Sequence, residues 1–468
     1  MILRFYDTYS RNKKVFKPLN GKQVKMFVCG PTVYDSPHLG HLRTYLFYDF
    51  LVRFLKLNGF EVFYLQNITD IDDKIINRAK ENKISPKKLA LKYEKEYLKD
   101  IKQLKIKNVT KYARATSYIK QIQDQIRRLI DKGYAYQTSD GIYYNVKKFK
   151  DYGKLAKRTA DKAQDATTRI DDSVSKINKG DFCLWKFKKD DEPFWKFEYG
   201  DGRPGWHIED TAISEYYFGP QYDIHGGAID LIFPHHEAEI AQMEALSGKK
   251  MVKYWIHTGF LLVNGEKMSK SLGNFLTVKD ILKISSIQTL RFFIASYHYR
   301  SPINFNTNLL SQAEESLQRI TNFYYQVLLA KNKNSKSVNF QEKIHLAKIG
   351  FFEENFLKAL ADDFNSPLAI SQVFNLIKYF YRQDKKLLEN FKINKKLLEF
   401  FAKFNEIFDV LEVKSLVIPK KVTILLDKRE KLRKNKEYKK ADELRKKITE
   451  LGYEVLDTPE GAKIKKIK

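Results

Sequence analysis

The chain has 468 residues, and 85 Lys plus Arg against 57 Asp plus Glu give a net charge of +28. This excess of positive charge favours a polyanionic binding partner such as nucleic acid, and a bias of the composition toward lysine is the alternative explanation. A hydrophobic fraction of 43% excludes a fully disordered chain, and the absence of a long apolar run or a signal-like start excludes a membrane span and a secretory leader. The only cysteines, Cys29 and Cys183, exclude a disulfide framework and predict a cytoplasmic location.

The first hundred residues predict one half of a Rossmann-like α/β fold. Residues 25–29 are typical of a buried strand, and residues 40–58 form an apolar-rich segment of helical length that ends at Asn58-Gly59. Residues 61–70 alternate and are rich in β-branched and aromatic side chains, which predicts a second strand. A ligand is therefore expected at the carboxyl ends of these strands.

A predicted insertion at about 112–202 interrupts this α/β pattern. It mixes basic helical stretches with a polar segment at 157–173. The α/β pattern resumes at 205–213 and 222–233 and ends near 267–274. We therefore expect one nucleotide-binding fold that is split by an inserted region.

The remainder of the chain is predicted to be helical. Apolar residues at intervals of three and four indicate a helix bundle over 308–412. The segment 421–468 has 16 Lys or Arg against 9 Asp or Glu, yet it keeps an apolar helix face, so a small folded basic domain is expected. The residues of these apolar faces are Ala313, Leu317, Ile320, Tyr324 and Val327, then Phe401, Phe404, Phe408 and Leu411, and finally Ala441, Leu444, Ile448 and Leu451.

The segment PHLGH, residues 37–41, lies where a predicted strand passes into a helix. Backbone N–H groups and the helix dipole favour a phosphate at such a position. Gly40 lets a flat ring approach the backbone, and His38 and His41 share one helix face from which they can donate to phosphate oxygens. Alone, the motif is also compatible with two surface histidines.

The segment KMSKS, residues 267–271, carries Lys267 and Lys270 on a short polar loop that can close over a triphosphate. Alone, such a lysine pair is often only a solvated surface. A HxGH segment after a strand, followed some 230 residues later by KMSKS, is the pattern of class I aminoacyl-tRNA synthetases.

The segments around these motifs narrow the resemblance to one family. The chain resembles cysteinyl-tRNA synthetase from about Thr8 to the DTPEG near its end, and the matching segments are FVCGPTVYDSPHLGH, NITDIDDKI, RPGWHIE, DIHGG, DLIFPHHEAEIAQ, KMSKSLGNF and HYRS. The resemblance implies a Rossmann-like catalytic domain at 1–260 with the insertion at 112–202, and a KMSKS and stem-contact region at 261–307. It further implies the bundle at 308–412 and an anticodon-binding domain at 421–468.

The resemblance also implies a zinc ion that binds the substrate thiolate, because a soft metal distinguishes a thiolate from a hydroxyl. The family ligands fall on Cys29, Asp210, His235 and Glu239, and Asp210 stands where the family has a second cysteine. Aspartate is a regular zinc ligand and keeps the charge, although it is harder than a thiolate. A retained metal with altered ligation is favoured over a metal-free pocket, and Cys183 is expected to be an ordinary buried thiol.

Further positions follow from the resemblance. Cysteine is expected at Cys29, Gly30, Thr69, Trp206 and Asp230, and ATP at His225, Gly226 and Gly227 beside the two class motifs, with Mg²⁺. The anticodon is expected at Arg433, Tyr438, Asp442 and Asp457. The implied protein is a monomeric enzyme that joins L-cysteine to tRNA(Cys) with ATP, forming AMP and pyrophosphate.

Three other functions stay open at this stage. A cysteine ligase that acts on an amino sugar shares the catalytic domain, but it lacks a basic tail like 421–468. A tRNA-binding protein without activity, or a synthetase for another amino acid, is supported only by Asp210.

Overall fold

A computed structural model describes residues 1–157, 175–268, 274–330, 340–412, 420–458 and 461–466. The chain divides into two compact units, Met1–Val410 and Leu411–Lys468, which we describe separately. The polar segment predicted at 157–173 lies almost entirely outside the described residues.

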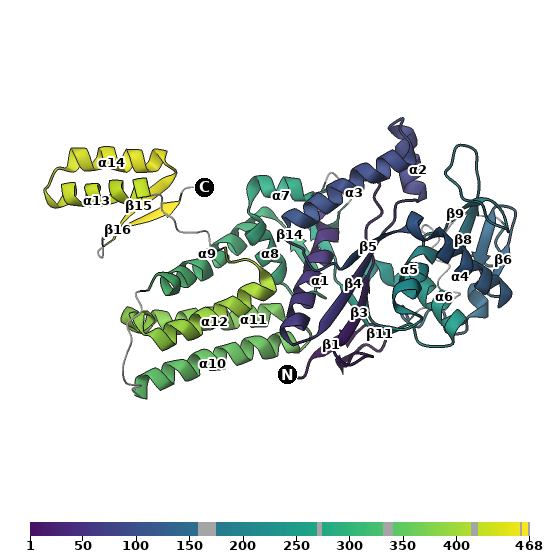
Figure 1. The fold of residues 1–468 in the computed structure, drawn as a ribbon, viewed down its shortest axis with the longest axis horizontal. Coiled ribbons are helices and arrows are strands. Elements are labelled where there is room, and N and C mark those ends of the chain that lie inside the picture. Colours follow the sequence, from purple (N-terminus) through teal and green to yellow (C-terminus); the bar gives the residue numbers. More distant parts are fainter. Residues whose placement is uncertain (158–174, 269–273, 331–339, 413–419, 459–460, 467–468) are drawn as a thin grey trace. The chain divides into compact units, whose positions relative to one another are not determined.

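A five-stranded parallel sheet forms the centre of the larger unit (Figure 1). The strand order is β11-β10-β3-β4-β5, so the chain first places β4 and β5 on one side of β3 and later places β10 and β11 on its other side. This confirms the Rossmann-like α/β prediction, and the order reverses between β3 and β10, where such folds bind ligands. The strands are β3 (Gln23–Val28), β4 (Glu61–Ile68), β5 (Lys111–Arg114), β10 (Tyr222–Ala228) and β11 (Val252–Thr258).

The helix α1 (Leu39–Leu57) connects β3 to β4, as its apolar sequence predicts. Most of its side chains are buried, and its end at Asn58 confirms the predicted stop. His38 caps its first turn. The helices α2 (Asp73–Glu81) and α3 (Pro86–Gln103), the second of which has Ser85 as its N-cap, then lead to the edge strand β5.

The inserted region begins later than predicted. Residues 111–114 form β5 of the main sheet, so the insertion starts after Arg114 rather than at 112. It contains a four-stranded antiparallel sheet that the basic, helix-like sequence did not reveal, because these strands are short and interrupted by long loops. Its elements are η1 (Ala115–Tyr118), α4 (Ile119–Asp131), β6 (Ala135–Gln137), β7 (Gly141–Tyr144), η2 (Val146–Lys148), β8 (Phe182–Phe187) and β9 (Gly202–Pro204).

Shorter elements frame the sheet and carry much of the site described below. A hairpin at the start of the chain hydrogen-bonds to β11 through Thr8 N and Trp255 O, 2.8 Å apart. These elements are β1 (Arg4–Asp7), β2 (Asn12–Val15), α5 (Ile208–Phe218), η4 (Ile229–Leu231), η5 (Ile232–His236), α6 (Glu237–Ser247), β12 (Leu261–Val263), β13 (Glu266–Lys267), α7 (Val278–Ile284), α8 (Ile287–Ala295) and β14 (Ile303–Phe305).

The predicted helix bundle follows in the same unit. Its apolar faces are buried as predicted, except that Phe323 rather than Tyr324 is the fully buried aromatic residue of the first helix. Figure 1 shows these helices beside α1 and α8. The elements are α9 (Thr307–Leu329), α10 (Phe340–Ala361), α11 (Ser366–Tyr381), η6 (Lys385–Glu389) and α12 (Phe391–Phe408).

The smaller unit is a helix pair followed by a hairpin. Val422, Ile448 and Val455 form its core, and Ala441 is also buried, which confirms a folded basic domain. Leu451, from the predicted apolar face, is 39% exposed. The elements are α13 (Lys420–Lys434), α14 (Tyr438–Glu450), β15 (Tyr453–Thr458) and β16 (Gly461–Lys466).

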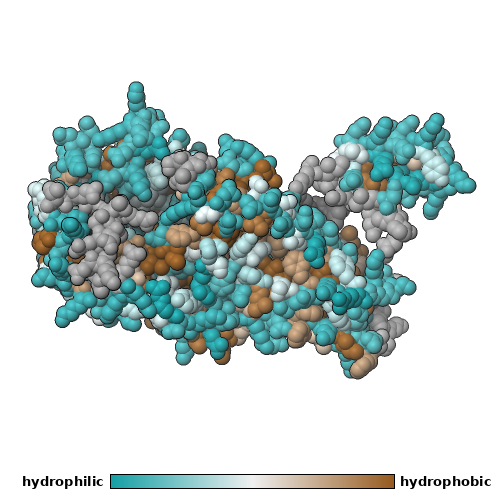
Figure 2. Space-filling model, turned by 180° about the vertical axis from the view of Figure 1, so that it is seen from behind, coloured by the Kyte–Doolittle hydropathy of each residue, from teal (hydrophilic) through white to brown (hydrophobic). Residues whose placement is uncertain are grey.

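The described helices include none that is both long and apolar enough to cross a membrane. On the face shown in Figure 2, hydrophilic residues cover most of the surface, and hydrophobic residues gather near the middle of the larger unit.

A buried ion pair joins the sheet domain to the bundle. The fully buried Arg291 of α8 donates to Asp49 Oδ2 of α1 at 3.2 Å and to the carbonyl oxygens of Leu104 and Phe408 at 2.6 and 2.8 Å. The guanidinium of Arg291 therefore connects its own helix α8 to α1, to the end of α3 and to α12. Each of these three neighbours provides an acceptor for its N–H groups.

Replacing this guanidinium by an apolar side chain is expected to destabilise the larger unit. Arg291→Met removes one of the two arginines that pair with Asp49, since Arg53 remains at 2.8 Å, and it leaves two buried carbonyl groups without this donor. The free energy of unfolding should therefore fall by about 2–4 kcal/mol. Urea denaturation of the full chain measures this. The control Arg127→Met removes an exposed arginine that pairs with Glu198, and it should cost at most about 1 kcal/mol. Equal losses in both variants would contradict the role of Arg291.

Candidate active site

A cavity of about 710 Å³ lies at the carboxyl ends of β3, β4 and β10. This is the position that the sheet order predicts. Residues of both class motifs line it, together with the side chains that follow β3 and those at the start of α5. Candidate-site residues in its wall are Cys29, Gly30, His38, Gly40, His41, Trp206, Asp210, Asp230, His235 and Lys267.

The two histidines of the HLGH segment lie at the start of α1. His38 Nδ1 accepts hydrogen bonds from the backbone N–H groups of Gly40 and His41, at 3.1 and 3.4 Å, and its ring stacks on that of His41 with centroids 3.7 Å apart. Burial lowers the pKa of His38 to about 4. The imidazole is therefore neutral at pH 7 with its proton on Nε2, so it offers a donor to the cavity.

Gly40 is needed for close packing of the two class motifs. A Cβ atom there would lie 2.9 Å from the His38 ring and 3.0 Å from Met268 Cε. The room that we expected for a nucleotide ring is therefore used, in this structure, by the His38 ring and by the first residues of KMSKS.

Both ends of the KMSKS loop lie beside the start of α1. Lys267 Nζ is 3.1 Å from Asp230 Oδ2, and beyond the loop Leu39 N donates to Leu276 O at 2.8 Å. Buried Arg43 of α1 donates to the carbonyl oxygens of Phe260 and Tyr299 at 2.5 and 3.0 Å, so it holds backbone that precedes the loop and backbone that follows it. Residues 269–273, with Lys270, lie outside the described residues.

The four predicted metal ligands converge at the base of the cavity. Cys29 follows β3, Asp210 lies in the first turn of α5, and His235 and Glu239 lie at the end of η5 and in α6. His235 Nε2 is 3.0 Å from Asp210 Oδ2 and 3.2 Å from Glu239 Oε1, and Cys29 Sγ is 3.9 Å from the same Oε1. The ligand atoms all lie within 4.8 Å of one another, so the structure brings the predicted set together.

The electrostatics of this group fit a cation. All four side chains are at most 5% exposed, and Asp210 Oδ1 and Glu239 Oε2 are buried without a hydrogen-bond partner. Burial, helped by the charges of Glu239 and Asp210, raises the pKa of the Cys29 thiol well above its ordinary value. Burial and the charge of Asp210 likewise raise the pKa of Glu239. A divalent cation relieves this repulsion and gives both orphaned oxygens a partner.

The predicted cysteine-binding residues surround this group. The Trp206 ring stacks on His235 with centroids 4.3 Å apart and lines the cavity. Gly30 packs so tightly that a Cβ atom there would lie 1.8 Å from Asn67 O. Thr69 is buried, and its hydroxyl donates to the carboxylate of Glu209. Asp230 lines the same cavity and pairs with Lys267.

The predicted contact of His225 with ATP does not agree with the position of its side chain. His225 is fully buried, and its Nε2 lies 3.5 Å from Cys29 Sγ, so the ring is directed into the protein and not into the cavity. This direction could not be predicted from the sequence, because the face on which a strand side chain lies depends on the register of β10. Gly226 and Gly227 pack against Tyr48 and His236, and their contact with ATP stays a prediction.

Three buried histidines, His207, His236 and His257, were missed by sequence reasoning. Each is at most 6% exposed, and together with His225 they lie around the metal ligands. His207 Nδ1 is 2.7 Å from His235 Nδ1, and His236 Nε2 is 3.1 Å from Cys29 Sγ. The adjacent pair His235-His236 was the available signal, since neighbouring residues in a turn can both reach one site.

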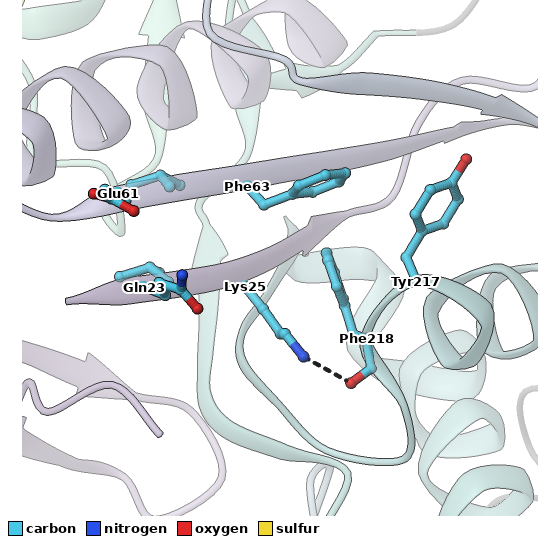
Figure 3. Close-up of a pocket in the computed structure, with 8 residues that line it drawn as sticks. Gln23, Lys25, Glu61, Phe63, Tyr217 and Phe218 are labelled. Atoms are coloured by element: carbon cyan, nitrogen blue, oxygen red, sulfur yellow. Dashed lines mark hydrogen bonds between the residues drawn. The ribbon is translucent and has the colours of Figure 1, made fainter. Parts of the chain in front are cut away.

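A second, smaller cavity of about 330 Å³ lies at the amino ends of β3 and β4 (Figure 3). Gln23 and Lys25 reach it from β3, Phe63 from β4, and Tyr217 and Phe218 from the end of α5. Lys25 Nζ donates to Phe218 O at 3.1 Å. This cavity lies at the opposite end of the strands from both class motifs, so it is not the active site.

In the smaller unit, the predicted anticodon residues differ in their surroundings. Arg433 Nη1 is 2.8 Å from Asp457 Oδ2, and the buried Arg429 also pairs with Asp457 at 2.9 Å, so this carboxylate holds β15 against α13. Tyr438, at the start of α14, is 58% exposed, and Asp442 is exposed on the same helix. Tyr438 thus has the free ring that stacking on an unpaired base requires.

The fold and the two class motifs together define a class I aminoacyl-tRNA synthetase. Residues 15–315 match the family described as tRNA synthetases class I (C) catalytic domain, residues 355–413 match the DALR domain, and residues 417–463 match the cysteinyl-tRNA ligase anticodon binding domain. The fold resembles that of a Mycobacterium tuberculosis methionyl-tRNA synthetase, with a TM-score of 0.63 at 13% identity, over 83% of this chain and 92% of that one.

Full-length relatives narrow the class to one family. The chain is 44% identical to a cysteine–tRNA ligase of Thermococcus gammatolerans over 100% of both chains. It is 42% identical to that of Clostridioides difficile over 99% of this chain and 100% of the relative. The chain belongs to the cysteinyl-tRNA synthetase family.

The lowered pKa of His38 predicts a specific protonation state. In full-length protein labelled with ¹⁵N-histidine, His38 should stay neutral with its proton on Nε2 from pH 8 down to about 5, because its pKa is about 4. His38→Gln assigns the signal. Since an unfolded histidine has a pKa of about 6.5, the contribution of His38 to stability is present above that pH and is lost as the pH falls toward 4. Protonation of folded His38 near pH 6.5 would contradict this.

Proposed function

We propose that the residues around the cavity carry out both steps of a cysteine–tRNA ligase. Membership of the family fixes the overall reaction: L-cysteine and ATP form cysteinyl-adenylate and pyrophosphate, and the cysteinyl group then passes to the terminal ribose of tRNA(Cys), releasing AMP. The proposal assigns roles to the residues of this chain. It rests on one observation above all, the convergence of both class motifs and a buried thiol–carboxylate–imidazole group on a single cavity.

In the first step, the cysteine carboxylate attacks the α-phosphorus of ATP, which enters as its Mg²⁺ complex. The neutral Nε2–H of His38, with His41, donates to phosphate oxygens as their charge grows. Lys267 and Lys270 neutralise the pyrophosphate that leaves. Lys267 pairs with Asp230, so the lysine assigned to the pyrophosphate lies beside the carboxylate assigned to the substrate ammonium.

The substrate side chain is expected at the base of the cavity, under Trp206. Cys29, Asp210, His235 and Glu239 would hold one Zn²⁺, which when bound supplies a Lewis acid that prefers a thiolate over a hydroxyl. Asp210 has the same charge as the family cysteine that it replaces. Trp206 excludes water from the thiol, and Thr69 with Glu209 provides acceptors beside the amino acid.

In the second step, the terminal ribose hydroxyl of tRNA attacks the adenylate carbonyl. The smaller unit is proposed to bind the anticodon through Arg433, Tyr438, Asp442 and Asp457. Its match to the cysteinyl-tRNA ligase anticodon binding domain supports tRNA over an amino sugar as the acceptor. The net charge of +28 favours binding to the phosphates of tRNA, so the affinity of the protein for tRNA should fall steeply as the salt concentration rises. A monomer acting in the cytoplasm is the expected form.

Zinc binding should depend on Cys29 and not on Cys183. Untagged wild-type protein is expected to contain about one zinc per chain, and a chelator should remove cysteine-dependent pyrophosphate exchange, which added Zn²⁺ restores. Cys29→Ser should lose both zinc and exchange, because it removes a ligand. The matched control Cys183→Ser should keep its zinc, since this buried thiol lines the same cavity but is not among the candidate metal ligands. Full exchange by wild-type protein without stoichiometric metal would contradict the proposal.

A further inference from the structure

The helix α3 carries a row of lysines on its exposed face. Their intervals of four, three, four and three residues place them on one side of the helix, and all five are exposed. At a rise of about 1.5 Å per residue the row is about 21 Å long. Neither class motif and none of the predicted site residues lies on α3. We call this row the lysine stripe, and its members are Lys88, Lys92, Lys95, Lys99 and Lys102.

The acidic residues of α3 do not neutralise the lysine stripe. Glu94 is buried and pairs with Arg114 at 2.8 Å, and Glu96 accepts a hydrogen bond from the Ser36 hydroxyl at 2.8 Å. Asp100 is 8% exposed, and burial raises its pKa to about 6. No ion pair among the described residues includes a lysine of the stripe. The exposed side of α3 is therefore purely positive.

Such a row reduces the stability of its own helix, because like charges three or four residues apart repel each other. Other helices of the larger unit avoid this repulsion by pairing their cations. Lys396 and Lys403 of α12 both pair with Glu353 of α10, Lys396 at 2.9 Å. Arg128 of α4 pairs with Glu215 of α5 at 2.6 Å. A lysine-rich composition alone does not explain why the stripe has no such partners, whereas an anionic ligand does.

The lysine stripe extends from the active-site cavity to the helix bundle. Figure 1 shows α3 at the outer edge of the larger unit, next to α2, and Asp73 and Lys74 of α2 line the cavity. The bond between Glu96 and Ser36 ties the middle of α3 to the loop that precedes His38. Beyond its far end, Leu104 O accepts from Arg291 at the junction with the bundle. A macromolecule whose end enters the cavity can therefore lie along α3.

The chemistry of the stripe fits a phosphate backbone rather than unpaired bases. Lysine is a compact point charge without the planar fork that recognises one particular group, so a row of lysines suits repeated anions. One strand of a duplex has a phosphate about every 3.4 Å, so the stripe spans about six of them. The aromatic residues of α3 are not free to stack on bases, since Tyr97 is buried and Lys92 Nζ lies over the Tyr93 ring, 5.0 Å from its centroid.

We propose that the lysine stripe of α3 binds the phosphate backbone of the tRNA acceptor stem. The terminal ribose of the tRNA enters the cavity, and the base-paired stem that carries it then lies within reach of α3. Because the contacts are made to phosphates, the stripe positions the stem and does not read its sequence. The inference rests on the proposed function in one respect, that the acceptor is a tRNA.

Two triple variants of the full chain test this surface. K92Q/K95Q/K99Q should bind a tRNA(Cys) transcript at least about tenfold more weakly than wild type at 0.1 M salt, and its plot of log affinity against log salt should be shallower by about 2–3. The control K17Q/K22Q/K249Q removes the same charge from exposed lysines that precede β3 and β11, at the strand ends away from the cavity, and should stay within about threefold of wild type. Wild-type affinity in the stripe variant, or equal weakening in both variants, would overturn the inference.

Two further measurements locate the effect. Cysteine-dependent pyrophosphate exchange needs no tRNA, so the stripe variant should retain the wild-type rate, and a lost rate would show that the substitutions act on the catalytic domain instead. A hairpin RNA that contains only the acceptor stem should lose affinity by the same factor as the whole tRNA. Weaker binding of the whole tRNA with unchanged binding of the hairpin would overturn the assignment to the acceptor stem. Failure of the proposed function has a different signature, since wild-type protein would then form no cysteinyl-tRNA.

Discussion

The crowding of acidic ligands in a dry interior is the constraint on which the rest of this structure depends. Cys29, Asp210 and Glu239 meet at the base of the cavity, almost without exposure, and two carboxylate oxygens there have no hydrogen-bond partner. Under the proposed function, a zinc ion held by these residues would neutralise their charge and would bind the substrate thiol.

The scaffold brings these ligands together from distant parts of the sequence. The reversal of strand order between β3 and β10 sets Cys29 beside the turn that carries His235 and Glu239, and α5 adds Asp210 from beyond the insertion. Arg43 holds the backbone on both sides of the KMSKS loop, and Arg291 connects the sheet domain to the bundle. These two buried arginines hold the scaffold in place, and we expect them to contact none of the three substrates.

The parts of this fold that depend on local patterns were predictable, and those that depend on register were not. The periodicity around α1 and its stop at Asn58 predicted the helix, the class motifs predicted the cavity, and the family resemblance predicted the four candidate metal ligands that converge there. The antiparallel strands of the insertion were missed because they are short, and β5 was placed in the insertion because nothing in four residues reveals their sheet. The inward direction of His225 depends on its pairing with Phe27 of β3, a long-range contact that the sequence does not display.

Selection of the substrate thiol by a metal is tested most directly by charging total tRNA with labelled cysteine, with labelled serine in a parallel reaction. A site whose ligands include Asp210 in place of a cysteine, and that still binds the thiolate through a soft metal, should form stable cysteinyl-tRNA and no seryl-tRNA. Comparable charging with serine would contradict the claim that a metal selects the thiol. No charging with either amino acid would contradict the assigned reaction.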